Sequence, residues 1–312
     1  MQVHHNIKSL PGFRKAVITI GTFDGLHSGH RQIFDLMKTE AAAINGETVI
    51  ITFDPHPRQI IASTKQPISL LNTLEEKIFL LDQTGIDHLV VVPFTQSFAD
   101  QTADEYIDNF LVDTFHPHTI IIGYDHHFGK NRSGNYKLLE ASASKNNYIV
   151  KEIPGYMLQD ITISSTRIRE TLLSGNIDTA NKFLGYNYFF SGKVVEGNKL
   201  GRTIGYPTAN IQIEDENKLI PGNGVYAVEV QLQATSHKLQ GMMNIGVRPT
   251  VDGKKRVIEV NIFDFNETIY GEKLTITIKK YLRSEVKFTD LDALKDQLAK
   301  DKAAALSVFN SI

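Results

Sequence analysis

The stretch AVITIGTFDGLHSGHRQI, residues 16–33, decides the fold of the first half of the chain. Its opening run, residues 16–20, is apolar without alternation, which is typical of a strand buried on both faces of a parallel sheet. His27 and His30 follow where a helix should begin, and residues three apart share one helix face. Because N–H groups at a helix start attract anions, this strand, loop and helix predict a site for a polyphosphate.

The same strand pattern returns along the first half of the chain. Further runs rich in Val and Ile cover residues 47–53, 88–94, 119–123 and 147–153. They are spaced by roughly 30 to 40 residues, the size of a βαβ unit. The glycine fingerprint G-x-G-x-x-G is absent from the first loop. The pattern predicts an open, doubly wound α/β sheet.

Helical patterns lie between these runs. Residues 73–85 predict a helix with Leu74, Ile78 and Leu81 on one face and Gly85 as its C-cap. Residues 103–115 predict a second helix, and its apolar face is formed by Tyr106, Ile107, Phe110 and Leu111.

The second half changes to short strands separated by turns. The strand-like segments are residues 188–197, 224–232, 238–246, 256–265 and 272–282. In the last segment Leu274, Ile276 and Ile278 alternate with polar residues, as in a half-buried antiparallel strand. The chain ends in a predicted helix, with Thr289 and Asp292 as a capping box and a stripe of Leu291, Leu294, Leu298 and Phe309. We expect a small antiparallel β-barrel closed by this helix, and two domains over residues 1–185 and 186–312, with short helices at 163–185 between them.

Composition excludes several classes of protein. The 312 residues carry 33 Lys+Arg against 35 Asp+Glu, so no overall field favours nucleic acid or a membrane surface. There is no cysteine, which excludes disulfides and thiolate metal sites. No apolar run is long enough to span a bilayer or to serve as a signal peptide. We therefore expect a cytoplasmic protein that binds neither nucleic acid nor membranes.

The first half resembles a known family. GTFDGLHSGHRQI resembles the opening motif of nucleotidylyltransferases of the H-x-G-H type. TFDPHP (52–57), GYDHHFGKNRSGN (123–135) and ISSTRIRE (163–170) follow in the order found in prokaryotic bifunctional riboflavin kinase/FAD synthetases. The resemblance implies a Rossmann-like domain that transfers the adenylyl group of ATP to FMN, giving FAD and pyrophosphate.

The resemblance also assigns residues to this first site. For ATP it implies Gly21, Phe23, Asp24, His27, His30, Ser164, Ser165, Thr166 and Arg167, with both histidines on the phosphates as catalytic residues. For the flavin it implies Asp54, Pro55, His56, Pro57, Asp125 and Phe128. Independently, hydroxyls at a helix start followed by Arg167 and Arg169 form an anion site. The chain departs from the family at His126 and His127, where an aromatic residue and an arginine are usual.

The second half carries a glycine-rich segment between Gly197 and Asn210. Its core, GRTIGYPTAN (201–210), resembles the signature of flavokinases. PGNGVYAV (221–228), NIGVRPT (244–250), EVNIFDF (259–265), YGEKL (270–274) and YLRSEVKF (281–288) follow in family order. The resemblance implies phosphorylation of riboflavin by ATP, giving FMN and ADP.

Roles in this second site also follow from the resemblance. Glu259 would be the base that accepts the proton of the ribityl 5′-hydroxyl, and Thr208 and Asn210 would bind Mg²⁺ together with ATP. The remaining ATP contacts would be Gly197, Gly201, Arg202, Gly205 and Pro207, and the flavin contacts Asn244, Gly246, Arg248 and Arg283. Asn261 replaces a histidine common in relatives, and we expect it to keep a similar hydrogen bond.

Two alternatives stay open at the level of sequence. The changes at His126 and His127 could disable adenylylation, leaving a riboflavin kinase with an inactive first domain. A flavin-binding or sensing module without turnover would keep the same motifs. The substrates ATP, riboflavin, FMN and FAD are common to the main interpretation.

Overall fold

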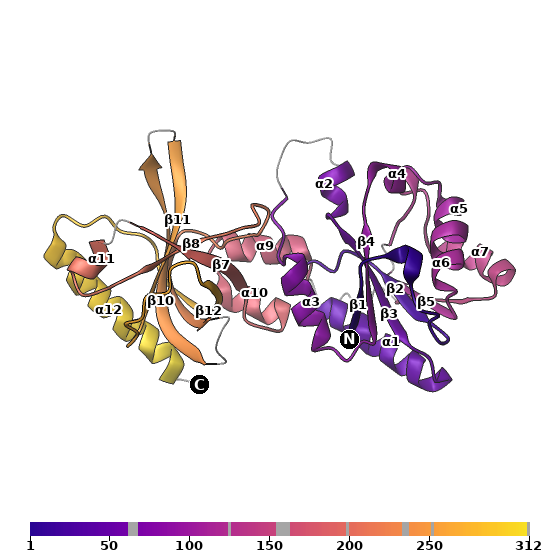
Figure 1. The fold of residues 1–312 in the computed structure, drawn as a ribbon, viewed down its shortest axis with the longest axis horizontal. Helices are drawn as coiled ribbons and strands as arrows, with labels where there is room; N and C mark the ends of the chain where they lie inside the picture. The colour runs from indigo at the N-terminus through magenta and orange to yellow at the C-terminus, as the bar shows by residue number, and fades with distance from the viewer. Residues whose placement is uncertain are drawn as a thin grey trace. The chain divides into compact units, whose positions relative to one another are not determined.

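The computed structural model describes residues 1–61, 68–123, 126–153, 163–197, 200–232, 237–250 and 253–310. The chain divides into two compact units, Met1–Ser164 and Ser165–Ile312 (Figure 1). The sequence analysis placed this boundary later, at residue 185. Residues 165–184 group with the second unit because Gly222 N donates to Leu172 O at 3.0 Å and Asn181 Nδ2 donates to Ile278 O at 3.2 Å.

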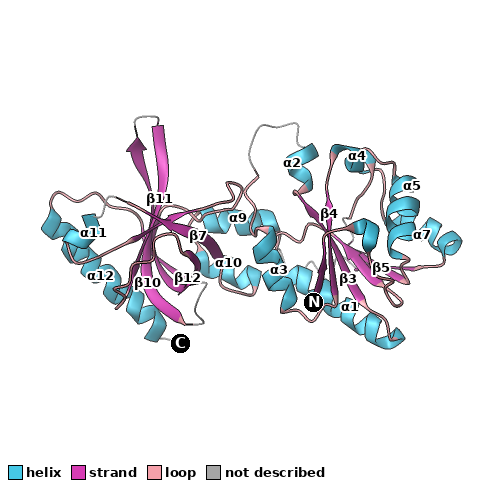
Figure 2. Cartoon of the chain, viewed as in Figure 1, coloured by secondary structure: helices cyan, strands magenta, loops and turns pink. Residues whose placement is uncertain are grey.

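The first unit is a parallel sheet with helices on both faces (Figure 2). Its strands are β1 (Gln2–His4), β2 (Val17–Ile20), β3 (Thr48–Asp54), β4 (His88–Pro93), β5 (Thr119–Gly123) and β6 (Ile149–Ile153). Its helices are η1 (Ile7–Ser9), α1 (Ser28–Ile44), α2 (Pro57–Ile61), α3 (Leu74–Asp82), α4 (Gln96–Ala99), α5 (Ala103–Glu105), η2 (Tyr106–Val112), α6 (Asp113–Phe115), η3 (Lys130–Arg132) and α7 (Tyr136–Asn146).

The strand order β1-β4-β3-β2-β5-β6 confirms the doubly wound parallel sheet. β2 lies at its centre and pairs with β3 on one side, Ile20 opposite Ile51, and with β5 on the other, Thr19 opposite Ile121. The chain therefore leaves β2 toward one half of the sheet and later returns to the other half. In open α/β sheets the crevice beyond the strand ends at such a reversal is where ligands bind.

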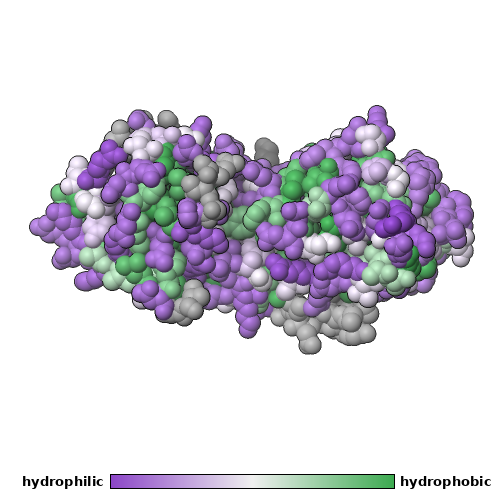
Figure 3. Space-filling view, turned by 60° about the horizontal axis from the view of Figure 1, so that its bottom comes forward, coloured by the Kyte–Doolittle hydropathy of each residue, from purple (hydrophilic) through white to green (hydrophobic). Residues whose placement is uncertain are grey.

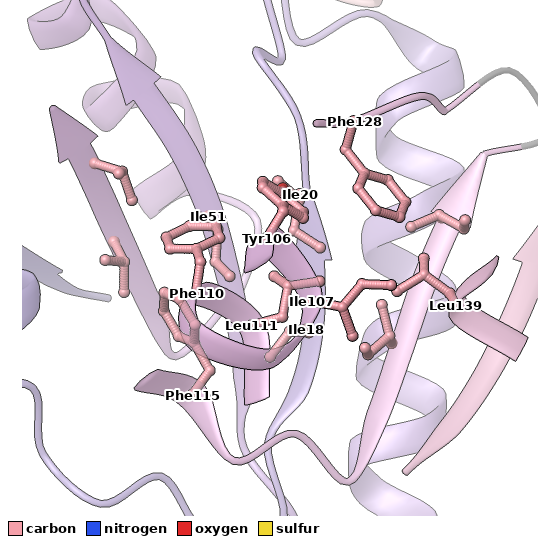
Figure 4. Close-up of a cluster of buried hydrophobic side chains, with 14 of the residues drawn as sticks. Ile18, Ile20, Ile51, Tyr106, Ile107, Phe110, Leu111, Phe115, Phe128 and Leu139 are labelled. Carbon is pink, nitrogen blue, oxygen red and sulfur yellow. The ribbon is translucent and has the colours of Figure 1, made fainter. Parts of the chain in front are cut away.

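One face of this sheet packs against the helix over residues 103–115. Ile18, Ile20 and Ile51 meet Tyr106 and Phe110 in a cluster of buried side chains (Figure 4). The four predicted apolar residues of this helix are at most 4 % exposed, as expected. Its middle, η2, is a π-helix, which the helical pattern did not predict. Asp113 N there bonds to Asp108 O, five residues back.

Helix α3 is rotated relative to the prediction. Its buried residues are Glu76, Lys77, Leu80 and Leu81, whereas Leu74 and Ile78 are only half-buried. The helix ends at Asp82 with Gln83 as its C-cap, so Gly85, with φ of 77°, belongs to the following turn. The rotation brings a lysine to the inside, which becomes important at the first site.

The second unit is a closed barrel with the strand order β10-β11-β8-β7-β12-β9, antiparallel throughout. Its strands are β7 (Phe189–Val195), β8 (Ala209–Gln212), β9 (Gly224–Leu232), β10 (Lys238–Thr250), β11 (Gly253–Ile262) and β12 (Lys273–Arg283). Its helices are α9 (Ser165–Leu173), α10 (Ile177–Leu184), α11 (Leu200–Thr203) and α12 (Leu291–Asn310). Leu274, Ile276 and Ile278 are fully buried, which confirms the alternation read in β12.

Helix α12 packs on the outside of the barrel. Leu298 and Phe309 contact a cluster that contains Met242 and Phe263. Leu291, predicted in this stripe, is 52 % exposed because it lies at the helix start. The cap also differs from the prediction. Ala293 N donates to Asp290 Oδ1 at 2.8 Å, so Asp290 caps the helix instead of a Thr289–Asp292 box.

The surface is mostly hydrophilic on the face shown in Figure 3, with hydrophobic residues in smaller patches. Among the helices that the structure describes, none combines the length and apolar character needed to cross a membrane.

Candidate active sites

The loop between β2 and α1, residues 21–27, forms the first site, at the reversal of strand order. Phe23, Gly25 and Leu26 adopt positive φ angles of 45°, 88° and 35°, so the loop is tightly folded. Phe23 is 3 % exposed, and its ring lies 5.4 Å from that of Phe34. A Cβ on Gly21 would come within 3.0 Å of the Phe23 ring. The ring thus fills the core under the loop, and any contact of Phe23 with a ligand falls to its backbone.

The two histidines stand together at the start of α1. Their rings are stacked with centroids 3.8 Å apart and planes 19° from parallel. His27 is 8 % exposed, and the buried Nδ1 atoms of both rings have no hydrogen-bond partner among the described residues. The structure brings the pair together as the sequence analysis predicted.

Both imidazoles are held neutral near pH 7. Burial lowers the pKa of His27 to about 4, against the smaller opposing effect of Asp24. Burial also lowers the pKa of His30 well below its usual value, with further lowering by His27 and by Lys77. A neutral imidazole keeps one N–H donor and one acceptor. The pair can therefore donate hydrogen bonds to phosphate oxygens without adding charge.

The side chains of Asp24 and Lys77 form hydrogen bonds around the loop between β2 and α1. Asp24 is 3 % exposed, and its Oδ1 accepts hydrogen bonds from the backbone N–H groups of Leu71 at 2.9 Å and Asn72 at 3.2 Å. Its carboxylate therefore holds backbone, a role that the predicted contact with ATP did not include. Lys77 Nζ donates to Thr22 O at 2.7 Å.

The predicted flavin residues 54–57 lie at the carboxyl end of β3, beside β2. Asp54 and Pro55 are exposed, and their peptide bond is cis. His56 and Pro57 are half-buried, and His56 Nδ1 accepts from Arg58 N at 3.2 Å. Neighbouring parallel strands end at the same edge of the sheet, so this segment borders the edge that carries the histidines.

The ring of Phe128, predicted as a flavin contact, lies mostly in the core. It is 6 % exposed and stacks on Tyr106 with centroids 4.8 Å apart, so it anchors the core. Asp125 lies outside the described residues. Ser165, Thr166 and Arg167 form the first turn of α9, directly after Ser164, and Arg167 lies over the Phe183 ring at 5.4 Å. This is the helix start predicted for the anion site.

The second site follows from the register of three barrel strands. Asn244 of β10 is opposite Glu259 of β11, which is opposite Asn210 of β8. Side chains directly opposite on neighbouring strands have Cβ atoms about 5 Å apart on the same face. The backbone ladder thus aligns the predicted base, a predicted flavin contact and a predicted metal ligand in one row.

Two cavities lie beside this row and share Thr208. The larger has a volume of about 240 Å³ and is lined by the polar residues Asn244, Arg248, Glu259, Asn261, Arg283 and Glu285. Its apolar wall includes Met242, Val286, Phe288, Leu294 and Leu298. The smaller cavity, about 70 Å³, is lined by Arg202, Pro207, Thr208, Phe265 and Tyr270 among others. The residue common to both marks the point where two ligands can meet.

The Pro207–Asn210 segment is held from several sides. Asn261 is 7 % exposed, and its Nδ2 donates to Pro207 O at 2.7 Å, which confirms that asparagine keeps a hydrogen bond at this position. A Cβ on Gly197 would overlap the Asn210 side chain, and one on Gly201 would overlap Tyr206 O. Gly205 has a φ of 84°. These contacts explain why the segment is rich in glycine.

The two arginines predicted as flavin contacts both carry ion pairs. Arg248 Nη2 lies 2.7 Å from Glu259 Oε2. Arg283 donates to both carboxylate oxygens of Asp301 in α12, from Nε to Oδ1 at 2.8 Å and from Nη2 to Oδ2 at 2.6 Å. Asp301 is 4 % exposed, so this pair fixes α12 to β12 and shapes the cavity wall. The Glu285 carboxylate packs directly against the backbone of Gly246, and a Cβ atom at this position would overlap it.

Comparison with known proteins identifies the family of each half of the chain. The sequence model of the FAD synthetase family matches residues 11–167, and that of the riboflavin kinase family matches residues 184–309. Curated relatives named bifunctional riboflavin kinase/FMN adenylyltransferase come from Haemophilus influenzae, 37% identical over 94% of each chain, and from Escherichia coli K12, 35% identical over 98% of this chain and 96% of that one. The chain belongs to the bifunctional riboflavin kinase/FMN adenylyltransferase family.

A solved structure agrees with the fold of this bifunctional family member over both units. It is titled macrolide-efflux protein from Streptococcus pneumoniae and is 32% identical, with a TM-score of 0.85 over 97% of this chain and 98% of that one. A Bacillus subtilis relative, also named bifunctional riboflavin kinase/FMN adenylyltransferase, is 35% identical over 99% of this chain. The family expected from the sequence motifs is therefore confirmed.

Sequence reasoning missed part of both sites of this family member. Lys77 was hidden in LEEKIFLL, where it looks like the polar face of an amphipathic helix. A usable signal was its spacing from Leu80 and Leu81, which puts it on their face. Glu285 and Asp301, which line the larger cavity, carried no signal from spacing because they come from a loop and from α12.

Proposed function

We propose that this chain makes FAD from riboflavin in two steps, phosphorylation in the second unit and adenylylation in the first. One observation carries the proposal: each unit holds its own candidate site, and the two sites are built from different groups. The first is a neutral histidine pair at the reversal of a parallel sheet. The second is a carboxylate in a barrel cavity, in line with Asn210.

In the kinase step, riboflavin occupies the larger cavity. Leu294 and Leu298 of α12 offer an apolar wall for the isoalloxazine ring, and the ribityl chain extends toward Glu259. Glu259 accepts the proton of the 5′-hydroxyl, whose oxygen then attacks the γ-phosphorus of ATP and releases ADP. A positioned base contributes typically 10²–10⁴-fold. The Arg248 guanidinium orients the carboxylate before the flavin arrives.

Mg²⁺ with ATP fits the residues beside the smaller cavity: Thr208 lines it, and Asn210 follows two residues later in β8. Thr208 offers a hydroxyl and Asn210 an amide oxygen, the hard donors that Mg²⁺ prefers, while ATP phosphates and water would supply the rest. The missing side chain of Gly197 leaves room for the Asn210 amide. Bound there, the metal would neutralise charge on the phosphates. Arg202 and Tyr270 would contact the nucleotide.

In the adenylyl step, a phosphate oxygen of FMN attacks the α-phosphorus of ATP, and pyrophosphate leaves. His27 and His30 donate N–H groups to the phosphate oxygens where charge develops. Ser164, the last residue of the first unit, supplies a further hydroxyl to phosphate, and residues 54–57 border the flavin. Gly21, Phe23 and Asp24 build the loop that holds the histidines. Neither step needs a covalent enzyme intermediate.

One incubation tests the proposal. The purified chain is mixed with riboflavin, ATP and Mg²⁺, and the flavins are separated by chromatography. We expect FMN and then FAD. FMN alone would reduce the function to a riboflavin kinase with an inactive first unit, and unchanged riboflavin would leave a flavin-binding module.

A further inference from the structure

Lys77 is a buried lysine directly beneath the first site. It lies in the first half of α3 and is 6 % exposed. Its Nζ donates to Thr22 O, in the loop after β2, at 2.7 Å and approaches Thr52 Oγ1, in β3, at 3.4 Å. The ammonium group thus links the loop after β2 to strand β3, at the edge of the sheet that carries the two histidines.

The charge of Lys77 has no direct counter-ion. Its hydrogen-bond partners are a carbonyl and a hydroxyl, and within the described ranges no carboxylate forms an ion pair with it. Asp24 and Asp54 raise its pKa through space, and burial, the larger effect, lowers it. Burying a charge without an ionic partner is costly, so such charges are retained where a ligand or a reaction uses them.

Binding a triphosphate at the first site needs positive electrostatic potential, which the two neutral histidines do not supply. Both rings are neutral near pH 7, whereas a nucleoside triphosphate brings several negative charges. In a site shielded from water, a fixed charge acts strongly on developing charge and needs no reorganisation during the reaction. Lys77 is placed to act in this way, through the Thr22 carbonyl that it orients and through the field that it adds.

We propose that Lys77 is a positioning residue for adenylyl transfer: its buried charge fixes the Gly21–His27 loop and provides positive potential beneath the triphosphate of ATP. This inference rests on the proposed function of the first unit. The groups that face His30 are His27 of the same helix, Lys77 of α3 and the Phe23 ring at 5.3 Å. Those that face Lys77 are Asp24, Asp54 and His30.

Two substitutions separate charge from hydrogen bonding. Lys77→Gln keeps a donor for Thr22 O and removes the charge, whereas Lys77→Met removes both. Lys38→Met is a matched control, because Lys38 Nζ also donates to a loop carbonyl of the same unit, Thr84 O at 3.1 Å. FAD formation from FMN, ATP and Mg²⁺ is measured with the full-length chain, together with the riboflavin kinase rate of each preparation.

We expect both Lys77 variants to form FAD about 10- to 100-fold more slowly than the unmodified chain, with a raised KM for ATP. The kinase rate and the Lys38→Met rates should stay unchanged. The His30 ring resonance, identified by its loss in His30→Ala, should titrate at higher pH in both Lys77 variants. A role limited to the hydrogen bond would leave the KM for ATP unchanged in Lys77→Gln, which keeps a donor for Thr22 O.

Several results would overturn the inference. One is FAD formation by Lys77→Gln at the rate of the unmodified chain, and another is a KM for ATP that stays unchanged in both Lys77 variants. Thermal unfolding of both variants below the assay temperature would show that the lysine acts on stability alone. If the unmodified chain forms no FAD, the proposed function fails instead, so the two failures are distinguishable.

Discussion

Replacing Asn261 by alanine tests how the barrel positions its nucleotide-binding segment. The substitution removes the bond from Asn261 Nδ2 to Pro207 O, 2.7 Å long and at a position 7 % exposed. Pro207 is exposed, so water can replace the lost donor, and the cost is that of a typical hydrogen bond, about 0.5–1.5 kcal/mol. Because Thr208 directly follows Pro207, the segment can recover part of this cost by moving, which displaces the hydroxyl proposed to bind Mg²⁺.

The size of the kinetic effect follows from this energy. If the cost falls on the geometry of the transition state, 1.4 kcal/mol corresponds to about tenfold in rate, so riboflavin phosphorylation should slow by roughly 2- to 13-fold. FAD formation from supplied FMN should keep its rate, because the first unit is untouched. The assay follows FMN and FAD by chromatography at saturating ATP.

Asn181→Ala is the matched control for this prediction. Asn181 Nδ2 also donates to a backbone carbonyl of the second unit, Ile278 O at 3.2 Å, and lines neither cavity. This variant should lose stability and keep its kinase rate. Phosphorylation by Asn261→Ala at the rate of the unmodified chain, or an equal loss in both variants, would refute the positioning argument.

Four further predictions concern the charged and titrating groups. His30→Ala should slow FAD formation by about 10²–10³-fold and spare FMN formation, and a loss of both in the chromatographic assay would contradict two separate sites. Glu259→Gln should slow riboflavin phosphorylation by about 10²–10⁴-fold while supplied FMN is still adenylylated, and a retained kinase rate would exclude Glu259 as the base. Burial lowers the pKa of His27 from 6.5 in the unfolded chain to about 4 in the folded chain, so the folded state disfavours the protonated ring. The stability that depends on a neutral His27 is complete above pH 6.5 and is lost as the pH falls toward 4, by up to about 3 kcal/mol. Thermal unfolding of His27→Gln should therefore depend less steeply on pH in this range. Arg283→Met leaves Asp301 buried without its partner, so the second unit should lose about 3 kcal/mol in denaturant unfolding and bind riboflavin more weakly in a fluorescence titration.

Strands with long apolar runs were predictable because their pattern is set by burial on both faces. β3 contains the run Val49–Ile51 and β5 the run Ile120–Ile122, and both strands were found within one residue of their predicted bounds. β1 is three residues long and β8 four, too short for periodicity to show. β8 exists because Ala209 and Asn210 pair with Val260 and Glu259, a long-range contact that local sequence does not encode.

The candidate sites divide in the same way. His27 and His30 were predictable because both belong to one short motif after a strand. Two ion pairs could not be predicted, Arg248 with Glu259 and Arg283 with Asp301. The partners lie 11 and 18 residues apart in the sequence, and only the packing of their strands and helices brings them into contact. The rotation of α3 that buries Lys77 is likewise a product of packing, since helical periodicity alone favoured Leu74 and Ile78.

The alignment of Asn244, Glu259 and Asn210 across three strands makes the kinase sensitive to changes in chain length. Neighbouring residues of a strand point to opposite faces, so deleting or inserting one residue between Glu259 and its hairpin would turn the carboxylate away from the larger cavity. Substitutions that preserve strand length leave this alignment intact. We therefore expect variation among functional descendants of this barrel to accumulate by replacement within strands, and length changes to be confined to its turns.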